Sequence, residues 1–378
     1  MKEKIEKLLG DLIAIDSTNP EIVPSAEGEA EIAAFVANWL EEAGLEVHLH
    51  ESAPNRPNVV AIARGRGGGK SLLLNGHMDT VGAGEMIKPH QPEIKNGRLF
   101  GLGALDMKGG LAACMLAAAQ AKKLQLRGDV ILTAVVDEEY AGKGTMTVAE
   151  LYHADGAIIA EPTQCQLIVA HKGFVWLDIE TIGVAAHGSR PDLGVDAIMK
   201  MGSVLSGLEE LQNSMQTRQP HPRLGHPSLH TSTIQGGREP STYPERCTLS
   251  IERRILPGEN PETVRAEVEE IIEKRRQIDP QFNAIIRTGL YRTPLETPED
   301  AAIVQAVKAA GSRVLNYSLE LSGAPYWTDA ATLWQAGIPS VIFGPSGEGI
   351  HAAEEWVELE SVADCLEIFI ETAQRFCA

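Results

Sequence analysis

Apolar residues recur with two different periods along the first part of the chain, which predicts a mixture of helices and strands. Residues 1–16 and 25–43 have the spacing of helices, and the second helix is expected to start near Ser25 as its N-cap. Runs typical of half-buried or buried strands follow at 45–50, 58–64, 71–76, 129–139 and 156–162. A helix rich in Ala and Leu after Lys108 and a further helix lie between the later runs, so we expect an α/β layered sheet.

The pattern changes after Lys172, where longer strands of the antiparallel type alternate with helices. The expected strands are 174–184, 230–237 and 246–258, and a long helix is expected from Gly194 to about Gln216. The stretch 216–228 is rich in Pro, Arg and His, which predicts an exposed loop or a strand connection.

From about Leu290 a strand and helix layer returns and the chain closes with a helix. The first domain is therefore predicted to be discontinuous, with residues 1–171 and 290–378, and an α+β domain is inserted at 172–289.

Composition favours a small-molecule substrate. The 378 residues, 43% of them hydrophobic, suffice for about two domains, and the net charge of −19 excludes the basic surface that nucleic acid or an anionic membrane requires. No apolar run has the length of a membrane span, and the amphipathic N-terminus carries no export signal. The five scattered cysteines contain no CxxC pair, which predicts free thiols in a reducing, cytoplasmic compartment.

Candidate metal ligands stand at the ends of the predicted strands. His77 and Asp79 project to one side of an extended segment, so the Asp79 carboxylate is expected to accept a hydrogen bond from His77 and leave its other nitrogen free for metal. Asp106 precedes a Gly pair that opens a helix, and it is either a helix cap or a ligand in a glycine-rich turn.

Adjacent carboxylates follow the apolar strand that ends near Val136. Glu138 and Glu139 repel each other unless a cation is near, so one of them is expected to bind metal while the other carries a proton. The alternative is a solvated acidic loop. Glu161 and His351, each ordinary when taken alone, complete the set of candidates.

In their order along the chain, six motifs resemble those of the di-zinc amidohydrolase and exopeptidase family (peptidase family M20), which includes acetylornithine deacetylase, succinyl-diaminopimelate desuccinylase and carboxypeptidase G. The motifs are GHMDTV, GLGALDMKGG, VVDEE, IAEPT, AAHGSRPDLGVDAI and GPSGEGIHAAEEWV. The resemblance covers essentially the whole chain. It implies a mixed-sheet catalytic domain of the zinc-exopeptidase type with helices on both faces, and an inserted dimerisation (lid) domain.

The same resemblance implies a role for each matching position. His77 and Glu161 would hold one Zn²⁺, Glu139 and His351 the other, and Asp106 would bridge both, with Co²⁺ or Mn²⁺ as possible substitutes. Glu138 would be the general base toward a metal-bridged water, and Asp79 the partner of His77.

The inserted domain carries two further candidates by resemblance. His187 would stabilise the oxyanion in the active site of a partner subunit, which implies a homodimer, and Arg254, beside Arg253, would bind the substrate carboxylate. Ser241 stands where close relatives usually carry Asn, so substrate contacts there are expected to differ, and Thr328 and Asp329 are expected beside the active site.

The expected reaction is hydrolysis of the amide bond of an N-acyl amino acid, as in acetylornithine deacetylase or succinyl-diaminopimelate desuccinylase. The alternative on the same scaffold is a carboxypeptidase or dipeptidase acting on short peptides. A non-catalytic dimeric scaffold would have lost ligands, and a single-metal hydrolase would lack one site, whereas every presumed ligand is present here.

Overall fold

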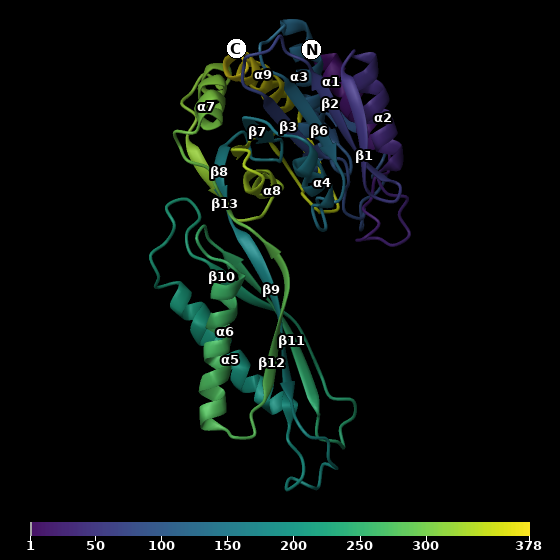
Figure 1. The fold of residues 1–378 in the computed structure, drawn as a ribbon. Coiled ribbons are helices and arrows are strands. Elements are labelled where there is room, and N and C mark those ends of the chain that lie inside the picture. Colours follow the sequence, from purple (N-terminus) through teal and green to yellow (C-terminus); the bar gives the residue numbers. More distant parts are fainter. Residues whose placement is uncertain (1) are drawn as a thin grey trace. The chain divides into compact units, whose positions relative to one another are not determined.

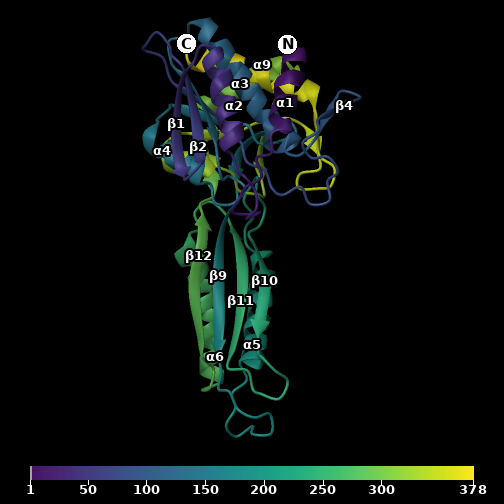
Figure 2. The same cartoon turned by 90° about the vertical axis from the view of Figure 1, so that its right-hand side faces the viewer.

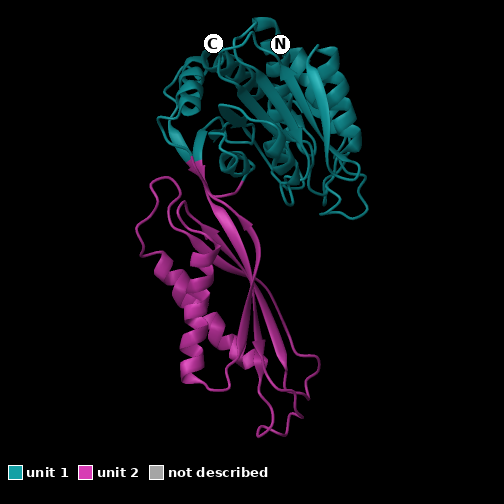
Figure 3. Ribbon diagram, viewed as in Figure 1, with its two compact units in different colours: residues 1–169, 297–322, 328–378 teal, residues 170–296, 323–327 magenta. Residues whose placement is uncertain are grey.

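A computed structural model describes residues 2–378, and these residues group into two compact units (Figure 3). Unit 1 runs up to Val169 and includes Thr297–Ser322 and Thr328–Ala378, and unit 2 comprises Ala170–Glu296 and Gly323–Trp327. The sequence predicts an inserted domain at 172–289, and unit 2 extends beyond 289 because β12 (Ala284–Arg292) runs past that residue and Gly323–Trp327 groups with unit 2.

A large mixed sheet, whose strands belong to unit 1 apart from β13 and the ends of β8 and β14, confirms the predicted α/β class (Figure 1). Its strands run in the order β1-β2-β6-β3-β7-β15-β8-β13, with β14 paired to β8. Their bounds are β1 Glu46–Ala53, β2 Arg56–Ala63, β3 Leu72–His77, β6 Val130–Val135, β7 Gly156–Ile159, β8 Leu167–His171, β13 Leu295–Glu296, β14 Leu321–Ala324 and β15 Ser340–Ile342. Strand β3 is parallel to both β6 and β7, whereas β1, β2 and β6 pair antiparallel.

Helices cover both faces of this sheet, because alternate residues of its strands point to opposite sides. Val59 and Ala61 of β2 belong to the main core, while Val60 and Ile62 pack on the other face with Val148 of α4. The helices are α1 Lys2–Ala14, α2 Ala30–Glu42, α3 Gly109–Leu124, α4 Lys143–Leu151, α7 Ala302–Leu315, α8 Ala330–Gln335 and α9 Leu359–Phe376, with a short π-helix at Ala104–Lys108 before α3.

A second, small sheet in unit 1 was not predicted from the sequence. It has the strand order β16-β17-β5-β4, with β4 Glu93–Lys95, β5 Arg98–Phe100, β16 Gly347–Glu348 and β17 Trp356–Glu358. These strands have two or three residues, too few to show a period in the sequence. The pairing of Trp356 with Phe100 brings the chain near residue 351 beside the glycine-rich segment that precedes Asp106.

Unit 2 is an antiparallel sheet with helices on one face (Figure 2). The strand order is β10-β11-β9-β12, with β9 Gly173–Ile182, β10 Ser228–Gly236, β11 Arg246–Ile255 and β12 Ala284–Arg292. The helices α5 Ala197–Met215 and α6 Pro261–Ile278 bury Met201, Val204 and Val268 against Leu177 and Leu249 of the sheet.

The start of one helix differs from the prediction, and the state of the cysteines agrees with it. Helix α2 starts at Ala30, not near Ser25, because Pro24 and the left-handed Gly28 keep the preceding chain irregular and Glu29 stands at the N-cap. The five cysteines are free thiols, as expected. Among residues 2–378, no helix combines the length and apolar character needed to cross a membrane.

Candidate metal centre

The candidate ligands gather at the carboxyl ends of β3, β6 and β7, where neighbouring parallel strands of an α/β sheet present their ligands. His77 is the last residue of β3, Glu138 and Glu139 follow β6, and Glu161 follows β7. Asp106 lies in the π-helical turn before α3 and His351 in the loop between β16 and β17.

Asp106 stands between the two histidines and offers one carboxylate oxygen to each. Its Oδ1 lies 3.2 Å from Nε2 of His77, and its Oδ2 lies 3.6 Å from Nε2 of His351. Glu161 Oε1 lies 3.6 Å from the same His77 nitrogen, and Glu139 Oε2 lies 3.2 Å from the same His351 nitrogen. The pair His77 and Glu161 and the pair His351 and Glu139 therefore each face one oxygen of the Asp106 carboxylate.

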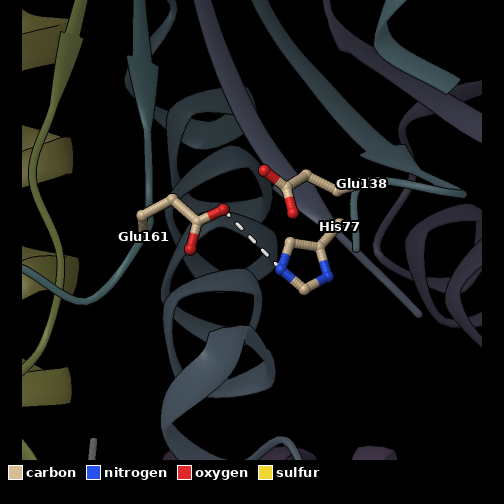
Figure 4. Close-up of side chains that lie close together, drawn as sticks. All are labelled: His77, Glu138 and Glu161. Atoms are coloured by element: carbon tan, nitrogen blue, oxygen red, sulfur yellow. Dashed lines mark ion pairs between the residues drawn. The ribbon is translucent and has the colours of Figure 1, made fainter. Parts of the chain in front are cut away.

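Glu138 reaches the same cluster from the strand end beside Glu139. In Figure 4 its carboxylate, that of Glu161 and the His77 ring face a common space. The donor atoms of these three residues lie within 4.8 Å of one another, as do those of His77, Asp106 and Glu139. Glu138 is therefore close enough to exchange a proton with a molecule held there.

Burial and mutual repulsion perturb the carboxylates. Burial, reinforced by the charge of Glu161, raises the pKa of Glu138, and burial with the charge of Asp106 raises the pKa of Glu139 and of Glu161. Burial alone would lower the pKa of His77, but the surrounding carboxylates outweigh it and raise that pKa. Four clustered carboxylates with two imidazoles have the donor chemistry of a site for divalent cations, which would remove this repulsion.

Asp79 does not make the contact expected from the sequence. The Nδ1 of His77 lies 2.9 Å from the backbone oxygen of Asp79, whereas the Asp79 carboxylate is 3.6 Å away. That carboxylate instead accepts the backbone N–H groups of Glu138 and Glu139, each at 3.2 Å. The chain turns after β3, so that the backbone carbonyl of Asp79 faces the imidazole ring of His77. The Asp79 carboxylate therefore points to the loop of Glu138 and Glu139 and holds it.

Two buried carboxylates support the centre. Asp329, a second choice from the sequence, accepts the hydroxyl of Thr145 at 2.6 Å, and Thr145 accepts the side-chain amide of Asn75 at 3.1 Å. Glu355 accepts three backbone N–H groups around Asp106. Sequence reasoning missed Glu355 because only the path of the backbone distinguishes this buried residue from its exposed neighbour Glu354.

A cavity of about 210 Å³ adjoins His351. Its walls are mostly small, with Gly82, Ala83, Gly84, Ala352 and Ala353 among the lining residues. Such walls admit a short group and exclude a bulky one.

In unit 2 the two neighbouring arginines have different surroundings. Arg253 is fully buried and pairs with Glu259 at 2.6 Å and Glu267 at 3.3 Å. Arg254 retains 30% side-chain exposure, donates to Glu252 at 2.6 Å and lies over the ring of Phe174. Arg254 is thus the one whose guanidinium is accessible to a ligand.

His187 lies on an exposed segment of unit 2 beside Ser241. Its Nδ1 is 2.8 Å from the Ser189 hydroxyl, and the N–H of Gly188 donates to the Ser241 carbonyl at 2.7 Å. His187 and Thr242 form an isolated antiparallel bridge. The Ser241 position, where the sequence departs from the expected Asn, therefore adjoins the His187 segment.

Comparison with known proteins adds independent findings. The sequence model of a family described as peptidase family M20/M25/M40 matches residues 73–375. An N-formyl-4-amino-5-aminomethyl-2-methylpyrimidine deformylase of Halalkalibacterium halodurans is 28% identical over 410 residues, covering 100% of this chain and 95% of the relative. An acetylornithine deacetylase of Myxococcus xanthus is 29% identical over 382 residues, covering 98% and 96%.

Among solved structures, the fold is similar to that of the YXEP protein of Bacillus subtilis, described as a dinuclear metal binding peptidase from the M20 family. The TM-score is 0.75 at 18% identity, over 99% of this chain and 97% of that chain.

Proposed function

The chain belongs to peptidase family M20/M25/M40 and is a metal-dependent hydrolase of amide or peptide bonds, and from this premise we propose that it deacylates an N-acyl amino acid with two bound zinc ions. His77 and Glu161 would hold one ion, Glu139 and His351 the other, and Asp106 both. Mixed imidazole and carboxylate donors also suit Co²⁺ or Mn²⁺.

The observation that carries this proposal is the position of Asp106. One of its oxygens faces the His77 and Glu161 pair and the other faces the His351 and Glu139 pair. Three protein residues for each ion leave room for substrate or water, as in catalytic sites.

The chemistry divides between the ions and the chain. When bound, the two ions supply a Lewis acid for the scissile carbonyl and bring the pKa of a water molecule toward neutrality. Glu138 would accept the proton of the attacking water as the C–O bond forms, and would then deliver it to the leaving nitrogen as the C–N bond breaks.

The substrate is proposed from two features of the chain. The cavity beside His351 has small walls, which favours a short acyl group such as formyl or acetyl. The guanidinium of Arg254 is proposed to bind the free carboxylate of the substrate, because a permanent planar cation matches a carboxylate. The names of the two relatives, a deformylase and a deacetylase, agree with a short acyl group.

A kinetic comparison separates the deacylase from its peptidase alternative. We expect kcat/KM for N-formyl and N-acetyl amino acids to exceed that for N-succinyl amino acids and dipeptides. Faster turnover of dipeptides would replace the deacylase proposal with a dipeptidase, and turnover of none of these compounds would reject both.

The Glu138→Gln variant tests the proton transfer. We expect kcat to fall by about 10²- to 10⁴-fold, because the amide cannot accept the proton of water. Metal content should stay the same as in wild type. The matched control is Glu150→Gln on the exposed side of α4, which should leave kcat unchanged. Unchanged turnover in Glu138→Gln would remove Glu138 from the mechanism.

We propose a cytoplasmic homodimer as the working form. The five free thiols support a reducing compartment. The exposed position of His187 on unit 2 supports its proposed role in the active site of a partner subunit.

A further inference from the structure

Glu355 is a buried residue of unit 1 whose carboxylate lies beside the backbone of Gly103–Asp106. It directly precedes β17, four residues after His351, and only 3% of it is exposed. Its Oε2 accepts the backbone N–H of Gly103 at 2.8 Å, and its Oε1 accepts those of Leu105 at 2.7 Å and Asp106 at 3.0 Å. One side chain therefore binds three amides of the segment that carries Asp106.

The π-helical turn that carries Asp106 is irregular, so its own hydrogen bonds do little to fix Asp106. Gly103 has a left-handed φ of 74°, and Asp106 has non-helical angles of φ −113° and ψ 97°. The N-cap residue of the π-helical turn is Gly103, which has no side chain to accept the first N–H groups of the turn. Without Glu355, the three amide donors would lose this acceptor, and an amide donor that is buried without an acceptor destabilises the conformation that buries it.

Other contacts also fix the position of the segment that carries Asp106. The Gly101 N–H donates to the backbone carbonyl of Glu355 at 3.1 Å, and Trp356 pairs with Phe100 across the small sheet. On the other side, the buried ammonium of Lys108 donates to the Ile15 carbonyl of the chain after α1 at 3.0 Å. Among these contacts, the Glu355 side chain alone reaches the amide of Asp106 itself.

We propose that Glu355 is a positioning residue of the metal centre, which fixes the Asp106 backbone against the His351 segment so that the Asp106 carboxylate faces both histidines. The inference rests on the proposed function, since it takes Asp106 to be the shared ligand. It predicts that Glu355 controls metal affinity and ligand geometry although it touches no ion.

The test measures metal binding rather than turnover. Metal-free full-length chain is titrated with Co²⁺ by calorimetry, and the visible absorption of the bound Co²⁺ reports ligand geometry. In Glu355→Gln, which keeps the side-chain shape, we expect affinity to fall by about 10- to 100-fold, the usual effect of removing a partner behind a metal ligand. The absorption spectrum should also change. The exposed neighbour gives the control, because Glu354→Gln should bind Co²⁺ as wild type does.

Urea unfolding of the metal-free variants separates positioning from a general structural role. We expect Glu355→Gln to lose more binding free energy than unfolding free energy. Wild-type affinity and spectrum in this variant would overturn the inference, as would an affinity loss fully matched by lost stability with no spectral change. If wild type itself binds fewer than two ions, the proposed function fails, whatever the variant does.

Discussion

At the scale of single residues, the neighbouring arginines Arg253 and Arg254 differ in burial and in their ion-pair partners. Arg253 points into unit 2 and is enclosed by Glu259 and Glu267, so its charge is balanced internally. Arg254, on the opposite side of β11, keeps part of its guanidinium exposed above Phe174. Alternation along a strand separates the two, because successive side chains point to opposite faces.

Replacing Arg254 with Gln should therefore weaken substrate binding without unfolding the protein. We expect kcat/KM to fall by about 10- to 100-fold, mostly through KM, as for the loss of a hydrogen bond to a charged group. Steady-state kinetics with an N-acetyl amino acid measures the effect. Arg287→Gln is the control, because Arg287 is a strand arginine paired with Glu180. Equal losses in both variants would contradict a specific role for Arg254.

The sequence was informative about single residues where a strand end or a motif marks them. His77, Asp106, Glu139, Glu161 and His351 were all singled out, and the structure brings them together. Their roles stay predictions. The sequence did not show that the Asp79 carboxylate accepts the backbone N–H groups of Glu138 and Glu139, and it was silent on Glu355, because such contacts depend on how the backbone turns in space.

At the scale of elements, glycines at the start of α3 determine how closely this helix approaches the sheet. A Cβ on Gly110 would lie 1.9 Å from the Ala160 carbonyl oxygen, one residue before Glu161. The backbones of α3 and of the chain after β7 are therefore in direct contact. This contact brings the Asp106 turn near Glu161, and no side chain larger than hydrogen fits between them.

Gly110→Ala should accordingly destabilise the protein although alanine favours helices. We expect a loss of about 1–3 kcal/mol in the free energy of unfolding, as for overpacking of a core, measured by urea unfolding. Gly202→Ala in α5 is the matched control, because a Cβ there meets no atom within 4 Å. It should gain about 0.5–1 kcal/mol from helix propensity. A stabilised Gly110→Ala variant would show that α3 stands farther from β7.

The strands of four or more residues were predicted better from the sequence than the strands of two or three residues. The strands β2, β3, β6 and β7 are predicted by nearly continuous apolar runs, because each strand is buried on both faces. The start of α2 was placed too early, since Ser25 is a good cap by residue type but the left-handed Gly28 follows it. The small sheet around β17 was missed because its strands are too short for any period.

At the scale of the whole molecule, the proposed dimer predicts that active sites are shared between subunits. His187→Ala and Glu138→Gln should each be nearly inactive alone, the first because an oxyanion donor is lost, which costs about 10²- to 10³-fold in kcat. After subunit exchange, a mixed dimer contains one site with both residues intact. Equal mixing should then restore about a quarter of wild-type activity, as expected for random pairing in a two-fold dimer.

The control for this experiment is each variant mixed with itself under the same exchange conditions. Mass measurement in solution by light scattering should give the mass of two chains. If the mixture stays as inactive as its components while subunits demonstrably exchange, His187 does not act on a partner's site. A monomer of full activity would reject the dimer as the working form.

The central claim is a dinuclear metal centre organised around Asp106, and the metal content of the gently purified chain tests it most directly. Elemental analysis should find about two zinc-like ions per chain, and chelation should remove both the ions and amide hydrolysis, with recovery on adding Zn²⁺. In Asp106→Asn the content should fall below two, because the shared ligand loses charge. Wild type with one ion or none after Zn²⁺ is supplied, or Asp106→Asn that retains two, would contradict the account.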